Sequence, residues 1–249
     1  MTNLAALLLE AAVRFPLRSA VRLRETILSY AELNELSARV AGGLSAHGVR
    51  AGDRVGMMVP YAPAFPVLYF GALRVGAIVL PMHPRTESAA ARPRGDARGA
   101  RLVFTSHDTT QVDGVETGDT TAVPVGPDFL TQMGLWPQAQ DVVSRADEDL
   151  AVMVPAEGPA NSPHSLALSH GTLREHAVVA ARRALEQTFT PGTSEFPGSG
   201  QSHGLNAVML AGACLAFDHA STAPVSRALP GRRMPADTAL PDGTADSTG

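Results

Sequence analysis

A loop of small residues at 156–165 carries the residue types with the clearest chemical meaning in this sequence. An apolar run at 150–155 leads into it, and an apolar pair follows before a helical pattern begins at Thr172. This order is typical of a phosphate-binding loop, in which backbone amides and hydroxyls bind phosphate oxygens. Two residues oppose that chemistry, because Glu157 adds a negative charge and Pro159 removes an amide donor. The loop therefore has the layout of a phosphate site without most of its binding groups.

Lysine is absent from the sequence, and all 20 basic side chains are arginine. The guanidinium fork of arginine is larger and differently aimed than an ammonium group, so it does not replace lysine in a tight phosphate site. Chemistry that needs a lysine on a transferring phosphate cannot come from this polypeptide.

A second pattern, Gly-x-Ser-x-Gly, spans residues 200–204 and places Ser202 where α/β-hydrolases carry their nucleophile. Asp218 and His219 follow in the chain order of a catalytic triad, although they are adjacent to each other. A nucleophile elbow needs a strand before it, whereas residues 191–199 are loop-forming. We therefore interpret the motif as a loop-to-helix turn, with a serine hydrolase using Ser202 as a minor alternative.

Three histidines recur at a spacing of six residues, namely His164, His170 and His176. No cysteine or carboxylate completes a metal site with them at the usual spacings, so we expect ordinary histidines and no bound metal. The single cysteine, Cys214, lies in an apolar stretch. It excludes an internal disulfide framework and predicts a small buried side chain.

Composition and charge exclude several classes of protein. A net charge of −4 over 249 residues gives no basic footprint for nucleic acid or for an anionic membrane. Residues 3–15 are amphipathic and are interrupted by Glu10 and Arg14, which predicts a helix rather than a signal peptide. No stretch approaches the ~18 uninterrupted apolar residues of a membrane span. We expect a soluble cytoplasmic protein without a membrane span.

The first part of the chain predicts strands that alternate with helices. Residues 20–28 have a hairpin pattern, and Ser29 with Glu32 forms a capping box ahead of a helix that ends at Gly48. The apolar stripe of that helix consists of Leu33, Leu36, Val40 and Leu44. The next predicted elements are a strand, a helix and a strand, at residues 55–59, 64–75 and 77–81. This order favours a parallel βαβ unit.

The second part of the chain is less regular. Residues 85–98 lack an apolar stripe, and residues 107–123 are rich in Thr, Asp and Gly, which predicts a loop. Thr172 and Glu175 form a second capping box, which predicts a helix to Gln187. The other predicted elements are a strand at 101–105, a helical turn at 128–133, a strand at 151–154 and a buried helix at 205–217. We expect a domain over residues 1–217 and a disordered tail over residues 218–249, which contain no aromatic residue.

Four short motifs in order resemble the N-terminal part of the adenylate-forming, or AMP-binding, superfamily, which includes acyl-CoA synthetases. They are residues 30–33 (Tyr-Ala-Glu-Leu), 52–55 (Gly-Asp-Arg-Val), 71–77 (Gly-Ala-Leu-Arg-Val-Gly-Ala) and 81–84 (Pro-Met-His-Pro). The resemblance continues to about Phe217. It implies an α/β fold with three layers, in which helices flank a mainly parallel sheet, as in the first half of that family's N-terminal domain. The later catalytic motifs and the C-terminal lid have no counterpart in this sequence, so no catalytic residue is carried over.

The loop at 156–165 can be compared with the phosphate-binding loop of this family, which resembles Thr-Ser-Gly-Thr-Thr-Gly-x-Pro-Lys-Gly and is followed by Thr-His. Gly158 and Pro163 match the loop, His164 occupies the lysine position, and Ser169 with His170 matches the downstream pair. The resemblance thus implies a vestigial nucleotide-binding loop that consists of Gly158, Ser162, His164, Ser165 and Ser169.

These patterns together predict a truncated, degenerate acyl-CoA synthetase-like protein without adenylation activity, acting as a partner-binding pseudoenzyme. We expect no cofactor and either a protein partner or self-association through an uncovered sheet edge. The alternative is one component of an ATP-dependent acyl-CoA or acyl-carrier ligase of fatty-acid metabolism, which would use ATP and Mg²⁺ and need a partner chain.

Overall fold

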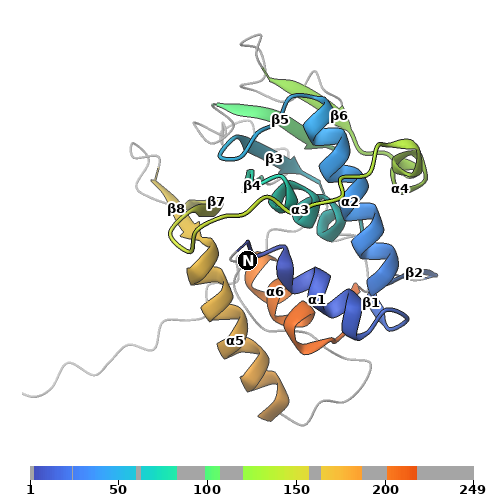
Figure 1. Ribbon diagram of the computed structural model, residues 1–249, viewed down its shortest axis with the longest axis vertical. Coiled ribbons are helices and arrows are strands. Elements are labelled where there is room, and N and C mark those ends of the chain that lie inside the picture. The colour runs from blue at the N-terminus through green and yellow to red at the C-terminus, as the bar shows by residue number, and fades with distance from the viewer. Residues whose placement is uncertain are drawn as a thin grey trace, which may run out of the picture.

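The mixed α/β fold is seen in a computed structural model, which describes residues 3–23, 25–59, 63–82, 99–106, 120–156, 164–186 and 201–217. Its larger sheet has the strand order β6-β5-β3-β4-β7-β8 and is parallel except for the antiparallel pair β7 and β8. These strands are β3 (Arg54–Met58), β4 (Ile78–Pro81), β5 (Ala100–Thr105), β6 (Thr121–Pro124), β7 (Leu150–Ala156) and β8 (His164–Ser169). A mainly parallel sheet with flanking helices is the architecture that the resemblance implied (Figure 1).

A smaller sheet lies beside the N-terminal helix and has the order β2-β1-β9. Its strands are β1 (Ser19–Leu23), β2 (Thr26–Ser29) and β9 (Leu215–Phe217). The antiparallel pairing of β1 with β2 confirms the hairpin predicted at 20–28. Strand β9 pairs in parallel with β1, so the smaller sheet brings the last described residues of the chain next to its N-terminal part.

Six helical segments accompany the two sheets in the described residues, together with one short 3-10 helix. They are α1 (Ala6–Arg14), α2 (Tyr30–Ala46), α3 (Ala64–Arg74), α4 (Phe129–Gln132), the 3-10 helix η2 (Met133–Leu135), α5 (His170–Glu186) and α6 (Gln201–Ala211). Helices α2 and α3 pack closely on each other, and α6 contacts both α1 and α5 (Figure 1).

Local sequence signals explain where α2 begins and ends. The Ser29 hydroxyl accepts a hydrogen bond from the Glu32 amide, while the Glu32 carboxylate accepts one from the Ser29 amide at 2.8 Å. This reciprocal capping box is the one predicted from the sequence. The chain leaves the helix through Gly48, whose φ of +79° lies in the left-handed region that glycine adopts without strain.

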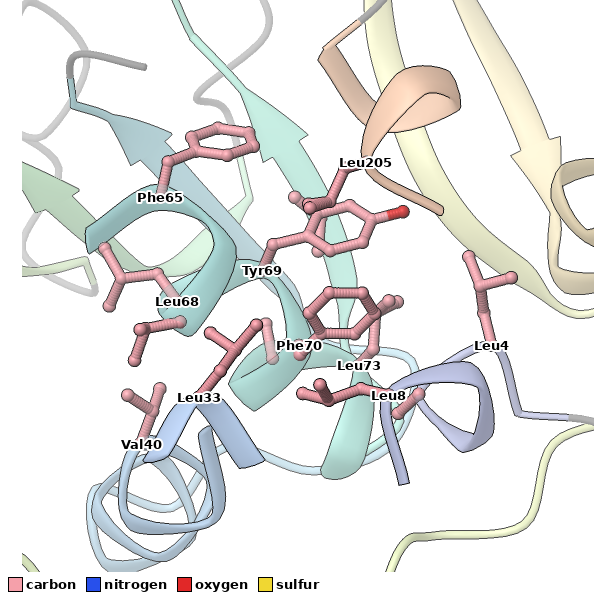
Figure 2. Packing of buried hydrophobic residues seen from close by; sticks show 14 of the residues in the cluster. Leu4, Leu8, Leu33, Val40, Phe65, Leu68, Tyr69, Phe70, Leu73 and Leu205 are labelled. Atoms are coloured by element: carbon pink, nitrogen blue, oxygen red, sulfur yellow. The ribbon is translucent and has the colours of Figure 1, made fainter. Parts of the chain in front are cut away.

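The main core joins helices that are far apart in the sequence (Figure 2). Leu33, Val40 and Leu44 of the predicted stripe are fully buried, whereas Leu36 is partly buried. The largest contribution comes from α3, which is buried over almost its whole length. Its core side chains include Phe65, Leu68, Tyr69, Phe70 and Leu73, which meet Leu4 and Leu8 from the α1 side and Leu205 from α6. Because α3 is covered on all sides, it is apolar throughout rather than amphipathic.

Three predicted boundaries are wrong. Residues 121–124 form β6 rather than the end of a loop, because they pair in parallel with β5. Residues 164–169 form β8, so the chain does not turn directly from β7 into a helix. The predicted helix at 205–217 ends at Ala211, since Gly212 adopts a φ of +63°, and its last three residues are strand β9. Residues 85–98 and the tail at 218–249 lie outside the described residues.

Candidate functional site

The candidate nucleotide loop connects two strands of a β-hairpin. Strand β7 pairs antiparallel with β8, from Leu150 opposite Ser169 to Ala156 opposite His164. The connection between them, residues 157–163, lies outside the described residues, and with it the predicted positions Gly158 and Ser162. His164 and Ser165 begin β8, and only their backbone is described. The two ends of this connection therefore lie at the edge of the larger sheet, where β7 ends and where β8, the strand that leads into α5, begins.

Ser169 ends β8 and caps α5. Its hydroxyl oxygen accepts a hydrogen bond from the Thr172 amide at 3.2 Å and lies 3.1 Å from the Thr172 hydroxyl, to which it donates. A serine that accepts from the third helical residue is an N-cap. The capping box predicted at Thr172 and Glu175 is therefore wrong by one turn, because the helix begins at His170. The hydroxyl of Ser169 is used within this cap.

His170, the residue after the cap, is fully buried. Its Nδ1 accepts a hydrogen bond from the Leu4 amide at 3.0 Å, and its Nε2 has no partner among the described residues. The pKa of His170 is lowered to about 4, first by burial and then by the nearby Arg145, while Asp149 acts in the opposite direction. The imidazole is therefore neutral at neutral pH, with its proton on Nε2.

The acidic turn before β7 lies against the start of α5. The backbone carbonyls of Asp149 and Asp147 accept hydrogen bonds from the amides of His170 and Gly171 at 3.0 and 2.9 Å. The Asp147 carboxylate lies 2.7 Å from the guanidinium of Arg174, and Asp149 lies 3.2 Å from Arg145. Both carboxylates thus form partly exposed ion pairs beside the base of the hairpin.

The histidines at the spacing of six are not brought together as metal ligands in the described residues. His170 is buried, whereas His176 is exposed on α5. Among the described residues, no group of three His, Cys, Asp or Glu side chains is arranged to hold a metal ion. Cys214 is partly exposed, so the expected buried side chain is only partly buried.

Ser202 of the Gly-x-Ser-x-Gly pattern falls in the first turn of α6, which begins at Gln201. Its side chain is not described, and the preceding residues together with Asp218 and His219 lie outside the described part of the chain. A nucleophile elbow places its serine at the turn before the helix. The position of Ser202 inside the helix favours the interpretation as a loop-to-helix transition.

A buried polar pair joins two helices and was not predicted from the sequence. The Asn206 amide on α6 donates a 3.0 Å hydrogen bond to the Tyr69 hydroxyl on α3, and both residues are fully buried. The available signal was a single asparagine inside the apolar run that begins at Leu205. Such a residue is buried only when it finds a partner.

The described residues contain no helix that is both long enough and apolar enough to cross a membrane.

Comparison with known families gives a match over residues 8–170 to the family described as AMP-binding enzyme. A feruloyl-CoA synthase of Amycolatopsis sp is 29% identical over 168 residues, which cover 66% of this chain and 32% of the relative. A nonribosomal peptide synthetase-like enzyme, fsqF, of Aspergillus fumigatus is 30% identical over 180 residues, or 71% of this chain and 12% of the relative. The chain thus spans a third or less of these relatives.

Solved structures with the same fold are matched over a larger share of their length. The structure of VinN superposes with a TM-score of 0.69 at 20% identity, covering 86% of this chain and 56% of that one. The N-terminal domain of FACL13 from Mycobacterium tuberculosis superposes with a TM-score of 0.67 at 20% identity, covering 87% and 57%. The described fold therefore corresponds to about half of each of these chains.

Proposed function

The chain belongs to the AMP-binding enzyme family, and from this premise we propose that it is an acyl-CoA synthetase-like pseudoenzyme that does not adenylate a carboxylate. Its role would be to bind a protein partner. A cytoplasmic location and a connection to fatty-acid metabolism belong to the same proposal.

The composition of the loop between β7 and β8 is the observation that carries this proposal. Adenylation requires donors and positive charge around the ATP phosphates. Here Glu157 would repel a phosphate, Pro159 has no amide hydrogen to donate, and His164 occupies the lysine position. The chain contains no lysine that could enter the site from elsewhere in its own sequence.

The direct test is ATP–pyrophosphate exchange with a panel of fatty, aryl and amino acids, together with calorimetric titration of MgATP. We expect no substrate-dependent exchange and no ATP binding by the natural chain. A triple variant, Glu157→Ser, Pro159→Thr and His164→Lys, should gain ATP binding because it restores donors and charge. Exchange above background in the natural chain would overturn the proposal. A triple variant that still fails to bind ATP would show that the loop is not the defect.

The partner-binding part of the proposal rests on the edge of the larger sheet. Within the described residues β8 pairs with β7 alone, and Leu166 on β8 has 53% of its surface exposed. An uncovered strand with an apolar side chain can pair with another chain. We expect concentration-dependent association by light scattering after size exclusion, which Leu166→Arg reduces. Leu135→Arg is the matched control, since Leu135 is 89% exposed but lies in η2, away from the sheet. Equal association of both variants and the natural chain would contradict this role.

A second candidate is a ligase component that acts with ATP and Mg²⁺ together with a partner chain. Two observations favour it. Gly158, Pro163, Ser169 and His170 match the family's loop and the pair that follows it. The chain also covers only 56% of the VinN structure, so a partner chain would have to supply the remaining part of the fold. The same exchange assay separates the two candidates when it is repeated on the complex purified from its source cells. Activity of the complex, but not of the chain alone, would identify the ligase component.

A further inference from the structure

The N-terminal segment is fixed to three distant parts of the fold by two consecutive residues. The Asn3 amide group donates to the carbonyls of Leu73 and Val143 at 2.7 and 2.8 Å. The next amide, that of Leu4, donates to His170 Nδ1 at 3.0 Å. These bonds hold the start of α1 to α3, to the connector before β7 and to α5. Asn3, Leu4 and His170 are all fully buried.

The bond between Leu4 and His170 depends on the protonation state of the imidazole. Nδ1 can accept from the Leu4 amide only while it carries no proton. Protonation would place an N–H donor opposite another N–H donor, and the bond would be lost. No described partner of Nε2 is available to offset that loss. The fully buried position of the ring also disfavours a charged imidazolium.

The charged groups around His170 do not compensate a positive imidazole. Asp149 and Asp147 face it from the connector, but each is paired with an arginine, Arg145 and Arg174 respectively. Residues 3–9 on the α1 side carry no charge. Consistent with this arrangement, the pKa of His170 is lowered to about 4, first by burial and then by Arg145.

We propose that His170 is an acid-released latch, in which a proton on Nδ1 frees residues 3–9 from the start of α5 while the larger sheet stays folded. Leu4 and Leu8 in this segment are core residues on the α1 side, beside the α3 side chains (Figure 2). Release of the segment uncovers the apolar faces of α3 and α6. The latch therefore makes the exposure of a hydrophobic surface depend on pH. It is independent of the proposed function, since it involves no nucleotide or acyl substrate.

Hydrogen exchange on the full chain at a pH of about 7 and about 5 tests the latch. After correction for the intrinsic rates, protection of peptides from residues 3–9 should fall about 20-fold, because the ring is harder to protonate in the closed state than in the open one. Peptides from β5 should stay better protected than residues 3–9 at both pH values, because they exchange only when the larger sheet itself unfolds. No fall in the protection of residues 3–9, or protection equal to that of β5 at both pH values, would overturn the proposal.

Two variants assign the effect to His170. The side-chain amide introduced by His170→Asn keeps an acceptor that does not titrate in this range, so residues 3–9 should stay protected at both pH values. His176→Asn removes an exposed histidine from the same helix and should behave like the natural chain. Loss of protection in His170→Asn equal to that of the natural chain would refute the latch. If that variant does not fold, nitrogen chemical shifts of the wild-type imidazole decide: a proton on Nδ1 at neutral pH, or an ordinary titration, would also refute it.

Discussion

Asn206 on α6 and Tyr69 on α3 form a buried side-chain hydrogen bond of 3.0 Å across 137 positions of sequence. Burial raises the pKa of Tyr69 above its usual range, although the bond from Asn206 acts in the opposite direction. The Asn206 carbonyl oxygen has no partner among the described residues. The pair therefore fixes how α6 packs on α3. Figure 2 shows Tyr69 beside Leu205, the neighbour of Asn206 on α6.

Removing the Tyr69 hydroxyl should destabilise the protein more than removing both polar groups. Tyr69→Phe leaves the Asn206 side chain buried without its partner, which should lower the free energy of unfolding by about 1–3 kcal/mol. Asn206→Leu in the Tyr69→Phe background should recover part of that loss, because no unsatisfied amide remains. Chemical denaturation of both single variants and the double variant measures the coupling. Purely additive effects would show that the two side chains do not interact.

Gly43 on α2 should not accept a methyl group. A Cβ at this position would clash with the ring of Trp136, which packs edge-on against Phe129 at 6.0 Å between ring centroids. Because the contact with Phe129 restricts how far the Trp136 ring can shift, Gly43→Ala should lower the free energy of unfolding by about 1–3 kcal/mol. Gly134→Ala is the control, since its Cβ meets nothing within 4 Å. Thermal and denaturant unfolding should separate the two variants, and equal stability would contradict the close packing.

Elements with a complete local signal were predictable from the sequence. The capping box of Ser29 and Glu32, the buried stripe of α2 and the unit β3-α3-β4 all follow from patterns within a few turns of chain. Strands β6, β8 and β9 were missed for a shared physical reason. Each has three to six residues and forms because a partner strand, distant in sequence for β6 and β9, is already in place.

The candidate site was predictable as a position in the chain but not as a set of contacts. Ser169 and His170 were identified by their place after the loop, and the structure uses them to cap α5 and to bind Leu4. A hydrogen bond between residues 166 positions apart leaves no trace in local periodicity. The remaining loop positions, Gly158 and Ser162, lie outside the described residues and stay predictions.

The capping box at α2 should add a pH dependence to stability. Hydrogen bonds from the Ser29 amide and then from its hydroxyl lower the pKa of Glu32 in the folded protein. The folded state therefore binds a proton less readily, so this stabilisation is present above the unfolded pKa and is lost as the pH falls through the folded value. Glu32→Gln keeps an acceptor but does not titrate, and it should flatten that acidic decline in thermal melts. Glu10→Gln, an exposed position on α1, should leave the decline as it is. A similar effect of both variants would count against the box as its source.

His170 should dominate the loss of stability between neutral and mildly acidic pH. Its pKa is about 4 in the folded protein, against 6.5 for the ordinary side chain. Since the folded value is the lower one, the unfolded chain takes up the proton first, and stability falls as the pH drops below about 6.5. Between a pH of about 7 and about 5 the expected loss in unfolding free energy is about 2 kcal/mol, and below a pH of about 4 this contribution no longer changes. Denaturant unfolding of the natural chain and of His170→Asn measures this loss of unfolding free energy. The variant should not show it, because asparagine does not titrate in this range. Parallel curves for the two proteins would assign the acid sensitivity to other groups.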